Sequence, residues 1–187
     1  MELTQAIRER RTVRQFASTP IPKALLVEVV DLACWAPSAG GQQGYRFVVA
    51  AGSARNEIQA RVAASLPQIR HLVEAEFAHD PALAEEVVTF HEAFGGAPVL
   101  VLAFAGHDAE GGPEVLSVSA AIQNLLLAAH QAGLGTAWTG FATFNTEIAT
   151  IVGMAGRPLI GIIPIGYPLS TPTPRPRAEG RVQWLGF

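Results

Sequence analysis

The chain has 187 residues, a length that fits a single domain with a core of its own. Hydrophobic residues make up 49% of it and charged residues only 16%, below the roughly 25% that is usual in soluble domains. The net charge of −3 argues against nucleic-acid binding, which favours a basic excess. Because so few charges cover a monomer poorly, we expect part of the surface to be buried in a homodimer.

The sequence predicts neither a membrane partner nor a secretory signal. The longest apolar run, residues 97–106, is shorter than the roughly 20 residues that cross a bilayer. Residues 8–11 are charged where a signal would be apolar. Cys34 is the single cysteine, which excludes an internal disulfide and fits a reducing compartment. We therefore expect a cytoplasmic protein, with Cys34 as a buried structural thiol among apolar helix neighbours instead of a nucleophile.

A short first helix is predicted to end near Arg10, where a cluster of basic residues begins. The stretch Arg10-Arg11-Thr12-Val13-Arg14-Gln15-Phe16 holds three guanidinium groups and a hydroxyl within five residues. Guanidinium groups stay charged and match phosphate oxygens in geometry. In an extended segment, Arg10, Thr12 and Arg14 share one face and Arg11 takes the other. The cluster predicts an anion site, and a solvated basic turn is the alternative.

A second helix and a loop of small residues follow. Prolines at positions 20 and 22 suit a helix entry, and apolar residues then keep helical spacing as far as Trp35, before Pro37 ends the helix. Residues 36–44 combine glycines with two amide side chains. Glycine frees backbone N–H groups to approach a flat ligand, so the loop predicts a binding role. A flexible surface loop is the alternative.

Residues 45–51 predict a strand, and Ser53 is expected to cap a helix over residues 54–66. Residues 67–96 predict two further helices that leave the sheet as an excursion.

Three histidines, His71, His79 and His91, fall within this excursion. The pair His91-Glu92 begins like a zinc-protease helix, but Gly95 stands where the second histidine is needed. Spaced histidines without a cysteine partner are ordinarily surface residues, so we expect no metal site.

The second half of the chain predicts a buried core. Residues 98–105 are apolar without alternation, which is typical of a central strand covered on both faces. Residues 114–131 predict a strongly apolar helix that ends at Gly133. The glycines of residues 133–138 superficially match a dinucleotide fingerprint, but Trp138 replaces the third glycine and a helix precedes the motif. The Rossmann interpretation therefore fails.

The C-terminal region predicts a last strand and an arm. Asn145 is expected to cap a short helix to Val152, and residues 159–166 predict another buried strand. Residues 167–181 are rich in Pro, Ser, Thr and Arg, which suits an extended arm across another surface. Residues 182–185 predict a strand that pairs with a partner subunit.

Together these motifs resemble the nitroreductase family of FMN-dependent oxidoreductases. The resemblance lies in five stretches in a specific order and spacing, at residues 10–16, 36–40, 120–125, 132–136 and 165–168. It covers about residues 4–52 and 97–185. It implies an α+β fold, a nitroreductase-like three-layer α/β/α sandwich with a mixed, mostly antiparallel central sheet flanked by helices. The expected single domain, 1–187, includes the helical excursion at about 67–96 and a C-terminal dimer arm at about 167–187 that adds a strand to the partner.

The resemblance also implies a set of FMN-binding residues. Those expected at the phosphate and the pyrimidine side of the ring are Arg10, Arg11, Thr12, Arg14, Arg175 and Arg177. Those expected to contact flavin bound mainly by the other subunit are Pro37, Ser38, Ala39 and Gly41. The backbone of Thr139 and Gly140 is expected near flavin N5. The chain departs from the common pattern at Gly41, where Asn is frequent, at Gly44-Tyr45, where Pro-Trp is frequent, and at Thr139, where some members have Glu.

The implied activity is transfer of a hydride from NAD(P)H through flavin N5 to a nitroaromatic, quinone or similar acceptor, in a ping-pong mechanism. No side chain is needed as an acid or base. The excursion is the expected wall of the substrate site, with Phe77 and Phe90 either lining it or packing in the core. Two alternatives stay open: a flavin-binding or flavin-sensing protein without turnover, and an enzyme with a specialised biosynthetic substrate. The acceptor and the choice of NADH or NADPH are left open.

Overall fold

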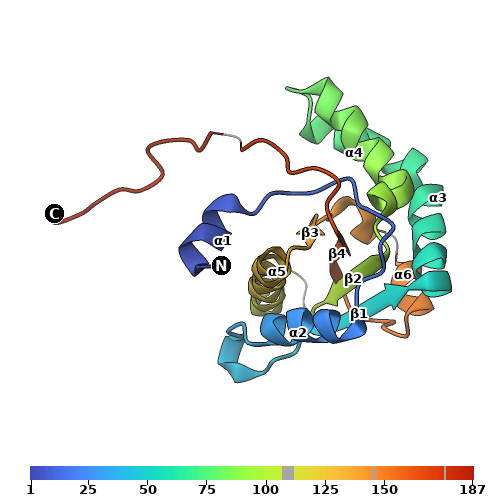
Figure 1. Ribbon diagram of the computed structural model, residues 1–187, viewed down its shortest axis with the longest axis horizontal. Helices are drawn as coiled ribbons and strands as arrows, with labels where there is room; N and C mark the ends of the chain where they lie inside the picture. The colour runs from blue at the N-terminus through green and yellow to red at the C-terminus, as the bar shows by residue number, and fades with distance from the viewer. Residues whose placement is uncertain (107–111, 145, 175) are drawn as a thin grey trace.

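The computed structural model describes residues 1–106, 112–144, 146–174 and 176–187 (Figure 1). A four-stranded antiparallel sheet lies at the centre, in the order β1-β2-β4-β3. The strands are β1 (Arg46–Ala51), β2 (Val99–Phe104), β3 (Gly135–Thr136) and β4 (Leu159–Gly166). A parallel bridge between Thr12 and Thr136 adds the N-terminal segment beside β3. The predicted α+β class and its mostly antiparallel sheet are confirmed.

Strand β2 is buried along its whole length because helices cover both faces of the sheet. Its alternate residues enter two different cores, as the two-residue period of a strand requires. Val101 packs with α2 (Lys23–Cys34) and α5 (Pro113–Gln131), whereas Leu102 packs with α3 (Gly52–Glu76) and its neighbours. The predictions of a doubly covered central strand and of a core helix near residues 114–131 are confirmed.

The remaining helices complete the two outer layers. They are α1 (Leu3–Glu9), which contacts α5, α4 (Pro81–Ala93), which packs along α3, and the short α6 (Glu147–Ile151). Helix α4 begins at a side-chain cap, because Asp80 accepts a hydrogen bond from the Leu83 backbone N–H at 3.1 Å. Asn145, the expected cap of the short helix, lies outside the described residues. None of the described helices is long and apolar enough to cross a membrane.

Helix α3 corrects two predictions. It begins at Gly52 with Ala51 as the N-cap, so Ser53 lies inside it, and it continues through Pro67 to Glu76. The first excursion helix is therefore the second half of α3. A proline inside a helix removes a hydrogen bond and costs about 3 kcal/mol or more. Packing outweighs this cost, since Leu66, Ile69 and Val73 are buried on either side of Pro67.

The expected burial of Cys34 is wrong for this chain, because the thiol is exposed. The buried stripe of α2 consists of Leu26, Val29 and Ala33. Cys34 lies one residue beyond Ala33, which rotates it out of that stripe. Although the residue is exposed, partial desolvation of the thiol raises its pKa, and the Asp31 carboxylate raises it further, so the thiol is not activated as a nucleophile.

The C-terminal arm follows β4 across the arginine segment and then extends away from the fold (Figure 1). Residues 182–185, predicted as a strand, are exposed and have no strand assignment in this single chain. Trp184 is 71% exposed and Phe187 fully exposed, which is unusual for such large apolar side chains. Pairing of this segment with a partner subunit stays a prediction.

Candidate functional site

The arginine segment is held between distant parts of the chain by backbone hydrogen bonds. Val13 N–H donates to the Thr136 carbonyl at 2.9 Å, and Phe16 N–H donates to the Gly95 carbonyl at 3.0 Å. The side chains of Val13 and Phe16 are buried. Gly95 is required at this contact, because it has a φ of +59° and a Cβ there would lie 1.9 Å from the Arg14 carbonyl oxygen. The segment is therefore a fixed part of the fold.

The basic side chains of this segment meet the C-terminal arm at a hollow of about 290 Å³, the arginine hollow. Its lining includes Arg10, Arg11, Thr12, Arg14 and Arg177. The prediction that Arg11 faces away is wrong. Its Nη1 donates to the carbonyl of Arg8 at 2.6 Å and to that of Arg10 at 2.7 Å, which turns the side chain back toward the cluster.

Electrostatics in the arginine hollow are unfavourable without an anion. Burial lowers the pKa of Arg10, and the positive charges of Arg11 and Arg177 lower it further. Within the described residues, the ion pairs involve none of these three arginines. A half-buried guanidinium among like charges is stabilised when an anion binds, so the geometry fits a phosphate.

Arg14 differs from the other arginines because it has a partner. Its Nη1 lies 3.3 Å from Oε1 of Glu86 on α4. The exposed fractions of the two side chains are 28% and 57%, so water screens the pair. Arg14 is therefore shared between the arginine hollow and the acidic surface of α4.

Two further hollows join the arginine hollow at Thr12 and Arg14, which line all three. One, of about 810 Å³, runs along α4 beneath residues 170–173 of the arm. The other, of about 100 Å³, reaches Thr139 and Gly140. We call the three together the groove. One end is cationic, and the rest includes aromatic and small residues, as an elongated ligand with a charged end requires.

The turn at Thr139 and Gly140 borders the groove and is anchored on the sheet. Thr139 N–H donates to the Ile162 carbonyl, and Ile162 N–H donates back, both at 3.1 Å. Among the described residues, the Gly140 N–H has no hydrogen-bond partner, and a Cβ at Gly140 would meet nothing within 4 Å. Of the two backbone donors expected here, Thr139 is thus occupied and Gly140 faces open space.

His91 lines the hollow beside this turn, and the expectation that it is a surface residue is wrong. It is 2% exposed, whereas His71 and His79 are exposed as predicted. Its Nδ1 lies 2.7 Å from the Val87 carbonyl oxygen, and its Nε2 contacts the Thr139 hydroxyl. Burial lowers the pKa of His91, and the charge of Arg14 lowers it too, against a raising effect of the Val87 carbonyl.

Phe77 and Phe90 both pack with hydrophobic clusters, and their contact with a substrate stays a prediction. Phe90 is buried and belongs to a core cluster, whereas Phe77 is half-buried. Both also line the hollow beside Thr139. Among the described residues, no group of histidines, cysteines and carboxylates is arranged to hold a metal ion.

The loop at residues 36–44 does not reach the groove of its own chain. Ala39 N–H donates to the Ser117 hydroxyl at 3.1 Å, and Gln43 N–H donates to the Ser38 hydroxyl at 3.0 Å. These contacts fix the loop against α5, and Figure 1 shows it on the opposite side of the fold from the arm. Pro37, Ser38, Ala39 and Gly41 line none of the three hollows.

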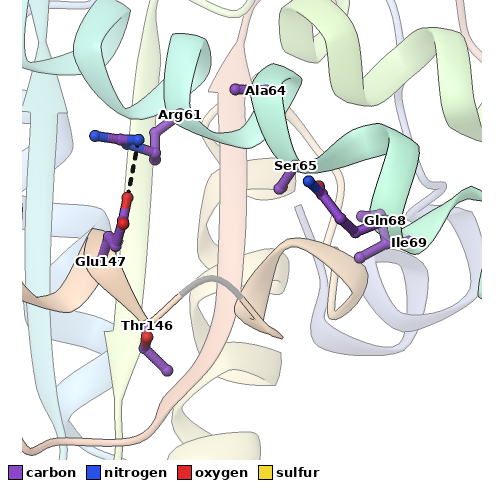
Figure 2. A pocket seen from close by; sticks show the side chains of 7 residues that line it. All are labelled: Arg61, Ala64, Ser65, Gln68, Ile69, Thr146 and Glu147. Atoms are coloured by element: carbon purple, nitrogen blue, oxygen red, sulfur yellow. Dashed lines mark ion pairs between the residues drawn. The ribbon is translucent and has the colours of Figure 1, made fainter.

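A separate hollow of about 420 Å³ lies between α3 and the start of α6 (Figure 2). Arg61 and Glu147 form an ion pair across it at 2.9 Å. The sequence predicted no site here, and none of its lining residues belongs to the groove.

Sequence reasoning found the cationic end of the groove because its residues are neighbours in the chain. Of the phosphate-end residues, Arg10, Arg11, Thr12, Arg14 and Arg177 come together, and Thr139 and Gly140 adjoin them. Arg175 lies outside the described residues. His91 was missed, although its spacing of four from Val87 on the apolar side of α4 is a signal for burial.

A comparison with known families identifies the fold. The model of the nitroreductase family matches residues 7–167, most of the chain. The chain belongs to the nitroreductase family. A relative from Methanothermobacter thermautotrophicus, which carries the name NADH dehydrogenase/NAD(P)H nitroreductase, is 28% identical over 181 residues, 94% of this chain and 82% of the relative.

Solved nitroreductases share the architecture described above. The FMN-dependent nitroreductase NfnB from Mycobacterium smegmatis, in complex with NADPH, has a TM-score of 0.80 at 20% identity, over 97% of each chain. A nitroreductase with bound FMN from Desulfitobacterium hafniense DCB-2 has a TM-score of 0.81 at 19% identity, over 99% of each chain. The described part of this chain therefore has the nitroreductase fold.

Proposed function

We propose that this nitroreductase-family chain is an FMN-dependent NAD(P)H oxidoreductase and that the arginine hollow holds the FMN phosphate. The observation that carries the proposal is the clustering of Arg10, Arg11 and Arg177, with the pKa of Arg10 lowered by burial and by both neighbours. Repulsion among these charges destabilises the cluster, and a bound anion relieves it. The names of the structural neighbours, which include bound FMN and NADPH, support the choice of this anion.

At the phosphate end, the guanidinium groups supply charge-assisted hydrogen bonds. Such bonds contribute about 1.5–3 kcal/mol each, so a few hold a cofactor without a covalent link. Arg10 and Arg11 approach from the segment that follows α1, and Arg177 approaches from the arm, so both ends of the chain close over one charge. Arg175, two residues earlier in the arm, is proposed to add to this set.

Along the groove, Thr12 and Arg14 are placed to bind the pyrimidine side of the flavin, since they line every part of it. A cation beside N1 and the C2 carbonyl favours the reduced, anionic ring. Gly140 offers its N–H toward the N5 edge, and its missing Cβ leaves room for close approach. FMN supplies the hydride chemistry when bound, and the described residues bind and orient it.

The site is proposed to be completed by a second copy of the chain. Pro37, Ser38, Ala39 and Gly41 lie on a loop that α5 holds away from its own groove. Contact with the flavin of a partner subunit would give this loop the predicted binding role. The exposed apolar residues Trp184, Leu185 and Phe187 would then be covered by the same partner.

The proposed reaction is ping-pong: NAD(P)H and the acceptor use the same opening of the groove in turn. Aromatic residues beside this opening, Phe77 and Trp138, suit flat molecules such as nicotinamide, nitroaromatics or quinones. Reduction of the acceptor needs no side chain as an acid, because solvent can supply the proton at the open face.

Anaerobic mixing of the FMN-loaded protein with NADH or NADPH tests the proposal. We expect the yellow colour to bleach and to return when a nitroaromatic or quinone is added. FMN that binds without being reduced would instead support a binding or sensing protein. The double variant Arg10→Ala/Arg14→Ala should be colourless, whereas Arg61→Ala, in the separate hollow of Figure 2, should keep its FMN. A double variant with stoichiometric FMN would refute the phosphate site.

A further inference from the structure

We propose that His91 is a positioning residue for the reaction, which it serves by holding Thr139 and so fixing the Thr139-Gly140 turn at the wall of the groove. This inference rests on the proposed function, because the turn affects turnover only if the flavin ring lies beside it. Nothing in the family-level pattern of the sequence assigned a role to His91. Four hydrogen bonds support the inference: those of His91 with Val87 and Thr139, and the two between Thr139 and Ile162.

The hydrogen bonds of His91 determine which ring nitrogen carries the proton. Its Nδ1 lies 2.7 Å from the Val87 carbonyl oxygen, which can only accept, so Nδ1 carries the hydrogen. In the neutral ring Nε2 then has a lone pair, and it accepts a hydrogen bond from the Thr139 hydroxyl. The tautomer is thus fixed by α4, and the direction of the Thr139 bond follows from the tautomer.

The surroundings of His91 favour this neutral form. The ring is buried against Phe90, Phe94 and Phe141, with ring centroids 5.6, 6.0 and 6.2 Å away. Arg14 brings a positive charge from the N-terminal segment, and both effects lower the pKa of His91. An uncharged imidazole among aromatic rings is rigid, so it holds its partner in one place.

Thr139 transmits this restraint to the groove. Its backbone pairs with Ile162 through two hydrogen bonds of 3.1 Å, and its hydroxyl is directed to His91. The residue is 5% exposed, so it has little freedom to choose other partners. The next residue, Gly140, borders the open space where the N5 edge is proposed to lie. Helix α4 therefore helps to set the position of the reacting edge through His91, which is 2% exposed and acts by way of the Thr139 hydroxyl.

The test is a set of variants at the two positions, measured as FMN affinity and as the rate of flavin reduction at saturating NADPH or NADH. Thr139→Val removes the hydroxyl and keeps the shape, and His91→Phe removes both nitrogens and keeps a ring. We expect either variant to retain FMN while reduction slows about 10- to 100-fold, since small misplacements at a reacting centre have effects of this size. The expected change is in the maximal rate, with KM for the nucleotide little affected.

Two further variants separate positioning from a general loss of structure. Thr139→Ser keeps the hydroxyl and should restore most of the rate. The double variant His91→Phe/Thr139→Val should be no slower than the slower single variant, because both act through one hydrogen bond. The exposed His71 provides the matched control. The flavin of the His71→Phe variant should be reduced by the nucleotide at the wild-type rate.

The outcomes distinguish this inference from the proposed function. Wild-type protein that binds no FMN, or binds it without reduction, would refute the proposed function and this inference with it. FMN-loaded Thr139→Val that is reduced as fast as wild type would refute the role of His91 alone. Effects of the two single variants that multiply in the double variant would refute it as well.

Discussion

Replacement of Arg10 by methionine should change two properties of the protein in opposite directions. Arg10→Met removes the charge but keeps an unbranched aliphatic side chain. The packing of the half-buried arginine stem is therefore largely retained. Arg11 keeps its bond to the carbonyl of residue 10, because that oxygen belongs to the backbone. The substitution therefore isolates the charge of Arg10 from its other contacts.

The expected loss of cofactor affinity follows from the bonds to the phosphate. One charge-assisted hydrogen bond contributes roughly 1.5–3 kcal/mol. Since about 1.4 kcal/mol corresponds to a tenfold change, the Kd for FMN should rise by about 10- to 100-fold. The protein without FMN should instead become more stable, because Arg11 and Arg177 lose a like-charged neighbour. That gain should be a few tenths up to about 1 kcal/mol, as for other solvent-screened pairs.

The assay is FMN titration by quenching of flavin fluorescence, together with urea unfolding of the FMN-free protein in a chloride buffer without phosphate or sulfate. Protein concentration must be held constant, because the proposed subunit association would contribute to the measured stability. Arg8→Met, on the exposed side of α1, is the control and should leave FMN affinity near wild type. Unchanged FMN affinity in Arg10→Met would refute the phosphate assignment, and a less stable FMN-free protein would refute the argument about charge repulsion.

Three further predictions concern the surroundings of the groove. Glu86→Gln frees Arg14 from a screened ion pair of 3.3 Å, so FMN should bind up to about fivefold more tightly in a fluorescence titration. The pKa of His91 is lowered in the folded chain, so the unfolded state binds more protons below about pH 6.5. The free energy of unfolding, measured with urea, should therefore fall as the pH falls through this range, by at most about 1.4 kcal/mol per pH unit from this group. Deletion of residues 182–187 removes exposed Trp184 and Phe187 and should shift the protein toward monomer in sedimentation experiments.

The first two of these predictions have a control variant. Glu85→Gln removes a neighbouring carboxylate that pairs with Arg70 instead of Arg14, and it should tighten FMN binding less than Glu86→Gln does. Equal tightening by both variants would contradict a specific role for the Arg14 pair. In His91→Phe the pH slope should become shallower, and the slope that remains includes His130, whose pKa burial also lowers. A slope unaffected by His91→Phe, or a truncated protein that remains fully dimeric, would contradict the respective argument.

The parts of the fold that the sequence predicted well have strong local patterns. Strand β2 is an unbroken apolar run, and α5 keeps helical spacing over 19 residues. The cationic end of the groove was also readable, because its main residues are consecutive. In these cases the determining contacts, or the patterns that imply them, lie close together in the chain.

The parts that were not predicted depend on distant contacts. Helix α3 continues through Pro67 because packing against α4 outweighs the local helix-breaking effect of the proline. The sequence around residue 67 gives no sign of that packing. His91 is separated by 48 positions from Thr139, the partner that makes its burial favourable. The loop at residues 36–44 has the expected composition, but its proposed ligand belongs to another subunit. Tertiary structure decides the first two features, and the proposed quaternary structure would decide the third.

The most direct test of the account is the visible absorption spectrum of the purified protein after incubation with FMN and removal of the excess, recorded together with its mass in solution. The account predicts a yellow dimer with stoichiometric, non-covalently bound FMN that is lost when Arg10 and Arg14 are both replaced by alanine. A colourless monomer that does not take up FMN would contradict it.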